Sequence, residues 1–143
     1  MNTRFRRVEL PRELRSLLMF DRKVFGESDC FAKAFWLTLE SYWMLVGDVK
    51  VGCCAFERHP ENTLYIATTG VVPAFQKLGF GSLLKAWEIA FARHHGFRRI
   101  VTNCRQRNRA MIALNRRFGF RIVRRKADDD PAYAAVVMEL RFE

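Results

Sequence analysis

Two glycines, at positions 79 and 81, stand in the segment of this chain whose residue types are best suited to bind a ligand. They follow an extended apolar run and lead directly into a helical pattern. Glycine allows a tight turn and a close approach of the backbone to a ligand, because no Cβ stands in the way. The first N–H groups of the following helix lack intrahelical acceptors, and the helix dipole favours an anion there. The segment therefore predicts a cradle for a phosphate or pyrophosphate group.

The spacing of these glycines excludes two nucleotide-binding motifs. A P-loop requires Lys and then Ser or Thr directly after its last glycine, and Ser82 and Leu83 follow Gly81. A dinucleotide fingerprint requires a third glycine three positions further on, where this chain has Leu84. The pattern is instead Gln-x-x-Gly-x-Gly after a Val-x-Pro that starts at Val71. An ordinary β-to-α turn, whose glycines serve packing alone, is the alternative interpretation.

The elements that must position this loop follow from hydrophobic periodicity and turn residues. Strands are predicted over residues 3–10, 42–46, 50–56, 63–72, 99–104, 120–125 and 134–142. Helices are predicted from Pro11 to Gly26, from Ser28 or Asp29 to about Leu39, from the glycine loop to about His95, and from Asn108 to Gly119. In the third helix we expect an apolar stripe of Leu83, Leu84, Trp87, Ala90 and Phe91. The order β-α-α-β-β-β-α-β-α-β-β, without repeat or linker, predicts one α/β domain over residues 1–143.

Composition narrows the class of protein further. The chain has 143 residues, of which 50% are hydrophobic, so it is long enough for a sizeable core and not typical of a disordered protein. No apolar run reaches the length of a membrane span, and no signal-peptide core follows the N-terminus. The four cysteines show neither metal-ligand nor disulfide-framework spacing. We therefore expect a cytoplasmic protein with reduced thiols, no metal and no membrane.

A second motif gives the glycine loop its context. Residues Asn108 to Phe120 read Asn-Arg-Ala-Met-Ile-Ala-Leu-Asn-Arg-Arg-Phe-Gly-Phe. This segment resembles the Asn-x-x-Ala-Ile-x-Leu-Tyr-x-x-x-Gly-Phe segment of the GCN5-related N-acetyltransferase (GNAT) family, whose acyl-coenzyme A loop the glycine segment also resembles. The 32 positions from Gln76 to Asn108 leave room for one helix and one strand, as in that family.

The resemblance extends to the whole element order, and it implies a fold and a ligand. The fold is a mixed, mostly antiparallel sheet of about seven strands with four helices, splayed between the strands at about 63–72 and 99–104. The ligand is acetyl-CoA, whose pyrophosphate the family holds with backbone amides of the loop. Carried over by position, these amides belong to Gln76, Lys77, Leu78, Gly79, Phe80, Gly81 and Ser82. Thr69, Val71 and Val72 would meet the pantetheine arm, and Asn108 would bond one of its amides or serve only as a helix N-cap.

The catalytic positions depart from the family pattern. Asn115 stands where many members have a tyrosine general acid, and Asn103 stands where some have a glutamate base. Asparagine cannot transfer a proton at neutral pH, although it can hydrogen-bond a sulfur atom or hold a water molecule. Tyr65, on the strand before the loop, lies at the depth where other members place a base. We therefore name Asn115 and Tyr65 as the candidate catalytic residues, with a half-buried structural aromatic as the alternative for Tyr65.

The distribution of charge suggests an anionic partner. The formal net charge is +10, and no acidic residue occurs between Glu88 and Asp128, where eleven arginines and one lysine fall. Coenzyme A is one such partner and nucleic acid is another, while a solvated basic face is the alternative for most individual arginines. Nucleic acid is disfavoured, because exposed aromatic residues are not interleaved and the basic segment spans buried elements.

Three hypotheses about function follow. The first is an N-acetyltransferase that moves an acetyl group directly from acetyl-CoA to a primary amine of an unidentified acceptor. The second is a non-catalytic acyl-CoA-binding module that has lost its acid and base. The third is a nucleic-acid-binding basic protein. The acceptor stays open, and so does a homodimer.

Overall fold

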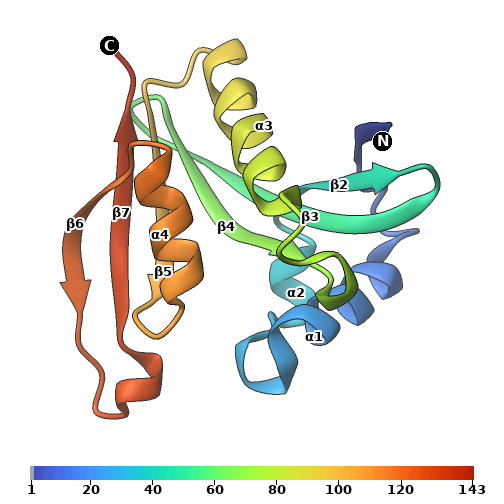
Figure 1. Ribbon diagram of the computed structural model, residues 1–143, viewed down its shortest axis with the longest axis horizontal. Helices are drawn as coiled ribbons and strands as arrows, with labels where there is room; N and C mark the ends of the chain where they lie inside the picture. Colours follow the sequence, from blue (N-terminus) through green and yellow to red (C-terminus); the bar gives the residue numbers. More distant parts are fainter. Residues whose placement is uncertain (1) are drawn as a thin grey trace. The chain divides into compact units, whose positions relative to one another are not determined.

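The computed structural model describes residues 2–143, and its elements occur in the predicted order (Figure 1). The strands are β1 (Thr3–Arg7), β2 (Glu40–Val46), β3 (Val49–His59), β4 (Thr63–Val71), β5 (Arg99–Arg105), β6 (Arg121–Lys126) and β7 (Ala135–Arg141). The helices are α1 (Leu14–Asp29), α2 (Lys33–Trp36), α3 (Phe80–His94) and α4 (Arg109–Arg117), with short 3-10 turns η1 (Pro73–Phe75) and η2 (Pro131–Tyr133).

The strands form one seven-stranded sheet in the order β1-β2-β3-β4-β5-β7-β6. The described pairs of β1 with β2, β2 with β3, β5 with β7 and β6 with β7 are antiparallel, whereas β4 and β5 are parallel. The β4–β5 register joins Thr63–Ile66 to Arg99–Thr102, so the paired stretch is shorter than either strand. The predicted fold class is thereby confirmed.

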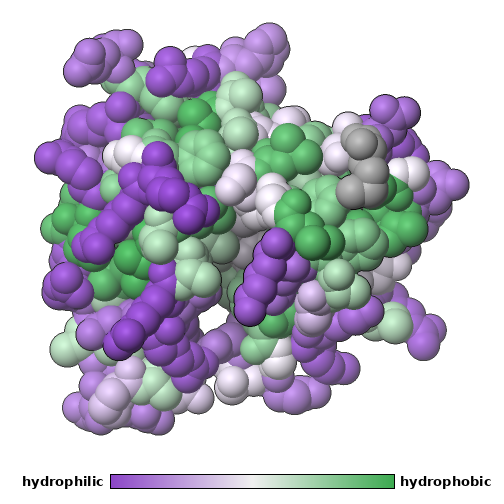
Figure 2. All heavy atoms as spheres, viewed as in Figure 1, coloured by the Kyte–Doolittle hydropathy of each residue, from purple (hydrophilic) through white to green (hydrophobic). Residues whose placement is uncertain are grey.

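Backbone contacts divide the chain into two compact units. The first unit comprises Met1–Glu57 and Thr68–Leu84, and the second comprises Arg58–Ala67 and Lys85–Glu143. None of the helices formed by residues 2–143 combines the length and the apolar character that crossing a membrane requires. In the view of Figure 2, hydrophilic residues lie mainly around the edge and apolar residues form patches between them, a mixture that is ordinary for folded proteins.

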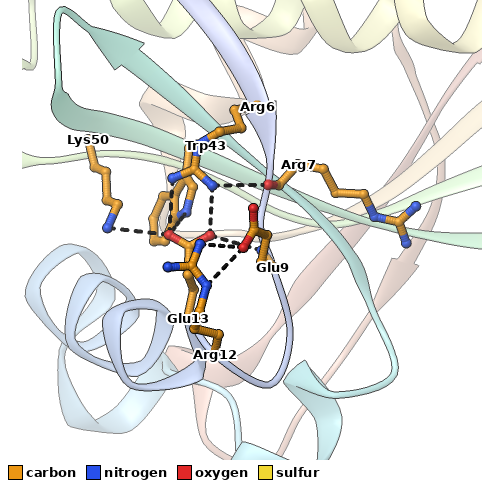
Figure 3. Close-up of polar contacts among 7 residues, drawn as sticks. All are labelled: Arg6, Arg7, Glu9, Arg12, Glu13, Trp43 and Lys50. Carbon is orange, nitrogen blue, oxygen red and sulfur yellow. Dashed lines mark hydrogen bonds and ion pairs between the residues drawn. The ribbon is translucent and has the colours of Figure 1, made fainter.

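A buried carboxylate ties together four segments of the first unit (Figure 3). Glu13, just before α1, accepts hydrogen bonds from Arg6 of β1 at 2.8 and 3.1 Å and from the indole N–H of Trp43 of β2 at 3.2 Å. The backbone N–H of Glu9 donates to it at 2.9 Å, and the ammonium of Lys50 of β3 lies 3.6 Å away. The hydrogen bonds from Arg6 lower the pKa of Glu13 to about 2, against the opposing effect of burial.

The sheet of the second unit has one face covered by α4, which lies along β5 and β7 in Figure 1. Even-numbered residues of β5 and β7 point to that face, because alternate side chains of a strand lie on opposite sides. Ile100, Val136 and Met138 among them are fully buried. The odd-numbered residues point to the opposite face, which has a different chemical character described below.

Two details of the helices differ from the prediction. The segment expected to be helical from Ser28 or Asp29 to Leu39 contains only the four-residue α2, and α1 continues to Asp29 across a non-helical Gly26 at φ 76°. The predicted stripe of α3 is partly wrong, since Leu83 is 42% exposed while Lys85 and Glu88 are buried. The mutual ion pair of these two charged residues is what lets the core accept them.

Candidate functional site

The glycine loop begins where β4 ends, and hydrogen bonds hold its first residues in place. The backbone N–H of Val72 donates to the carbonyl of Val51 on β3 at 3.0 Å. Pro73 occupies the first turn of η1, where its missing N–H costs nothing. The side-chain amide of Gln76 then donates to the carbonyl of Val71 at 2.8 Å and closes the loop back onto the strand. The loop is therefore held both by β3 and by its own Gln76.

The backbone of the loop leaves open space above Gly79. Gly79 has φ +91°, and a Cβ built there would meet no heavy atom within 4 Å. Lys77 also has a positive φ, of 64°. The N–H of Leu83 finds an acceptor in the carbonyl of Gly79 at 3.1 Å. The earlier amides, of Phe80, Gly81 and Ser82, precede that first helical bond and lie at the positive end of α3, where an anion is stabilised.

Buried side chains hold the two ends of the loop in place. Val71, Val72 and Phe80 are between 5% and 9% exposed, and Thr69 is 8% exposed. The rings of Phe75 and Phe80 meet edge to face with centroids 5.7 Å apart, which fixes the start of α3 against η1. All the predicted loop and pantetheine residues except Asn108 lie in the first unit.

Asn108 is the N-cap of α4. Its Oδ1 accepts from the backbone N–H of Met111 at 3.2 Å, so Asn108 caps the helix whether or not it also binds a ligand. In residues 2–143 no hydrogen bond engages its Nδ2, and the amide group keeps donors for a further partner. Capping and ligand binding by Asn108 are compatible.

Asn115, predicted at the family's tyrosine position, is fully buried in the second unit. Its Nδ2 donates to the sulfur atoms of Cys104 at 3.4 Å and Met138 at 3.6 Å. Its Oδ1 is buried without a hydrogen-bond partner among the described residues. Burial raises the pKa of the Cys104 thiol, and this effect outweighs the nearby positive charge of Lys85. The thiol is therefore kept protonated and inert at neutral pH.

An ion pair that sequence reasoning missed lies in the same core. The Lys85 ammonium is 2.8 Å from a carboxylate oxygen of Glu88, and the two side chains are 1% and 0% exposed. The ammonium also lies 5.3 Å from the centroid of the Phe120 ring. The signal available in the sequence was opposite charge at i and i+3 on the buried face of a helix.

Tyr65 lies half-buried on β4 with its ring stacked on that of His59, with centroids 5.2 Å apart and planes 15° apart. The register aligns Tyr65 with Val101 of β5, so it points away from α4. Asn103, exposed on β5, points to the same face. Tyr65 and Asn103, which the sequence resemblance suggested as positions of proton-transfer groups, thus share one face of the second unit.

The order of elements, the parallel β4–β5 pair and the glycine turn into α3 together define an acyltransferase-like fold, and a comparison of the sequence with family profiles identifies it. Residues 11–120 match the profile of the Acetyltransferase (GNAT) family. The match covers more than half of the chain, and the chain belongs to this family. The comparison with curated proteins gave no match.

Solved structures share the fold over nearly the whole chain. The ribosomal-protein-S18-alanine N-acetyltransferase from Escherichia coli is 15% identical, with a TM-score of 0.84 over 98% of this chain and 94% of that one. An acetyltransferase from Bacillus subtilis in complex with CoA is 20% identical, with a TM-score of 0.79 over 99% and 100%. The protein yncA from Salmonella typhimurium, with its cofactor acetyl-CoA, is 16% identical, with a TM-score of 0.76 over 100% and 95%. These structures are similar to the chain in fold.

Proposed function

We propose that this protein is an N-acetyltransferase that transfers an acetyl group from acetyl-CoA to a primary amine. The observation that carries the proposal is the loop from Gln76 to Ser82. It combines a left-handed Gly79, open space where a Cβ would stand and the amides that begin α3. This arrangement suits a pyrophosphate held by backbone amides. CoA and acetyl-CoA in the two related structures give independent support.

The remaining cofactor contacts in the proposal are assigned by the positions of residues in the two family motifs. Backbone groups of Gln76, Lys77, Leu78, Gly79, Phe80, Gly81 and Ser82 hold the pyrophosphate. Thr69, Val71 and Val72 meet the pantetheine, and the Nδ2 of Asn108 donates to it. Acetyl-CoA supplies an activated acetyl group as a thioester. We also propose that residues 1–143 act as one domain in the cytoplasm, in line with four free cysteines.

The reaction is a direct transfer. The neutral amine nitrogen attacks the thioester carbonyl carbon, the new C–N bond forms and the C–S bond breaks. The amine loses one proton and the leaving thiolate gains one, so the products are an amide and free CoA. Holding the two reactants together supplies much of the rate increase, since positioning alone can lower a barrier by about 7 kcal/mol or more.

We assign the two candidate catalytic residues different roles. The Tyr65 phenol relays the proton from the attacking amine. Asn115 positions α4 against β5 and β7 through its contacts with Cys104 and Met138. For Tyr65→Phe we expect kcat to fall about tenfold or more with an unchanged Kd for acetyl-CoA. An unchanged kcat would remove Tyr65 from the mechanism.

The loop is tested by a matched pair of glycine variants. Gly79 and Gly96 both have a positive φ, and a Cβ at either would meet nothing within 4 Å. Gly79→Val and Gly96→Val therefore impose similar backbone strain, but only the first places atoms over the cradle. Calorimetry should show no acetyl-CoA binding at millimolar ligand for Gly79→Val and a Kd within about threefold of wild type for Gly96→Val. Equal affinities in the two variants would refute the cradle.

A second candidate function is a non-catalytic acyl-CoA-binding module. The identity of residue 115 favours it, because an asparagine, which cannot transfer a proton at neutral pH, stands where many family members have a tyrosine. A turnover assay separates the two candidates. Steady release of free CoA thiol with any amine of a broad panel supports the transferase, whereas tight acetyl-CoA binding with no turnover on the whole panel supports the module.

A further inference from the structure

The face of the second unit's sheet that points away from α4 carries a dense set of cationic side chains. The register of β5, β7 and β6 aligns Val101 with Glu139 and Arg121, Asn103 with Val137 and Arg124, and Arg105 with Ala135 and Lys126. Residues aligned in this way point to the same side of a sheet. The face, called the basic face below, thus gathers Arg99, Arg105, Arg121, Arg124, Lys126 and Arg141.

One carboxylate lies among these six cations, and it is already engaged. Glu139 is 8% exposed, and its two oxygens accept from Arg99 at 2.9 Å and from Arg141 at 2.8 Å. Burial alone would raise the pKa of Glu139, but the hydrogen bonds from Arg141 and Arg99 outweigh it and lower the pKa. Glu139 therefore stays ionised and neutralises only one of the six positive charges.

The excess charge is exposed and concentrated in this unit. Arg121, Arg124, Lys126 and Arg141 are exposed, and β6 is the last strand of the sheet order. The second unit holds fifteen basic and seven acidic residues, whereas the first holds ten and eight. A second copy of the chain docked face to face would bring like charges together, so self-association through the basic face is unfavourable. The face is complementary to an anion that extends over several side chains.

Tyr65 and Asn103 point to the same face as these cations. Tyr65 is aligned with Val101, and Val101 with Glu139 and Arg121, so one row of side chains runs from the proposed proton-transfer residue to the edge strand. Neighbouring strands are about 4.8 Å apart, so β4 and β6 are separated by about 14 Å across the row. An extended polypeptide covers this distance with about four residues.

We propose that the acceptor is a polypeptide whose reactive amine is followed, two to five residues away, by acidic side chains that lie on Arg121, Arg124 and Lys126. The inference rests on the proposed function and on the assigned role of Tyr65. A polypeptide is favoured over nucleic acid because it carries a primary aliphatic amine together with regularly spaced anions. It is favoured over a small amine because the cations extend across three strands of an open face.

The proposal is tested with two peptides that have the same amino-acid composition but a different order of residues. Two lysine-free 16-residue peptides with a free N-terminus carry four Asp residues, at positions 3–6 in the near peptide and at positions 12–15 in the far peptide. Acetyl transfer from acetyl-CoA is followed by mass spectrometry. We expect kcat/KM to be about tenfold higher for the near peptide, as for three partly exposed ion pairs. The difference should lie in KM and shrink as salt is raised.

Two triple variants locate the effect on the protein. Arg121→Glu, Arg124→Glu and Lys126→Glu together should abolish the preference for the near peptide. The control variant combines Arg116→Glu, Arg117→Glu and Arg125→Glu. It changes the net charge equally, but its residues lie on α4 or on the other face of β6, so the preference should survive.

Glu139→Gln keeps the shape of the side chain and releases Arg99 and Arg141, so KM for the near peptide should fall about threefold.

Each outcome decides the proposal. Equal rates for the near and far peptides, turnover of small amines without turnover of peptides, or equal loss in the two triple variants would overturn it. Tighter binding of a 16-nucleotide oligouridylate than of the near peptide, measured by fluorescence anisotropy, would overturn it in favour of nucleic acid. Absence of turnover with every amine despite acetyl-CoA binding would instead refute the proposed function.

Discussion

Replacing Glu13 by Gln should cost the protein a large part of its stability at neutral pH and progressively less as the pH falls towards 2. The carboxylate is 8% exposed in the first unit and has four polar neighbours, one of which, Arg6, contributes two hydrogen bonds. Its pKa of about 2 in the folded protein compares with an ordinary value of 4.5. The difference of about 2.5 units corresponds to about 3.4 kcal/mol, since one unit is about 1.36 kcal/mol.

The sign of the pH dependence follows from the lowered pKa. The contribution of Glu13 is fully present well above pH 4.5 and is lost as the pH falls through about 2. By linkage it amounts to about 3.4 kcal/mol at pH 7, about 2.6 at pH 4 and about 1.4 at pH 3. Gln has the shape of the protonated acid, so the gap in unfolding free energy between wild type and Glu13→Gln should close along this curve.

Urea unfolding at these three pH values, followed by circular dichroism, measures the gap. Glu9→Gln is the matched control, because Glu9 is 58% exposed and pairs near the same carboxylate with Arg12, which is 70% exposed. Such a surface ion pair contributes about 1 kcal/mol at most to the free energy of unfolding. A cost of Glu13→Gln no larger than that of Glu9→Gln at pH 7, or the same cost at pH 7 and pH 3, would refute the stabilising role of the ionised Glu13.

Two further predictions concern the core of the second unit. Lys85→Met should lower the unfolding free energy by about 3–5 kcal/mol in urea titrations, because it leaves Glu88 charged in the core. The double variant Lys85→Met/Glu88→Leu should recover most of that loss, and a double variant less stable than the single one would contradict this account. Because burial raises the pKa of Cys104, iodoacetamide at pH 8 should modify it far more slowly in the folded protein than in urea. Peptide mass spectrometry should find the partly exposed Cys30 alkylated first, and early modification of Cys104 would contradict its assigned burial.

Local signals in the sequence anticipated much of the fold. Glycines, prolines and alternating or helical periodicity gave the element order and the turn into α3, because these features depend on backbone freedom over a few residues. The second helix was predicted too long, because hydrogen bonds to Asp21 hold part of this segment. The backbone N–H of Phe31 and the indole N–H of Trp36 donate to the Asp21 carboxylate at 2.7 and 3.0 Å. These contacts join residues ten and fifteen positions apart, which local propensity cannot register.

The sequence by itself determined that a glycine turn precedes a helix and that a basic segment follows it. Only the tertiary structure decided how the basic segment is divided between the two sides of a sheet. Strand alternation and the irregular register between Ile122 and Arg124 put Arg121, Arg124 and Lys126 on one face and Arg125 on the other. Residues from three strands became one basic face because cross-strand alignment joins positions distant in sequence. The same long-range packing admitted Lys85 and Glu88 to the core, where each charge is tolerable only beside the other.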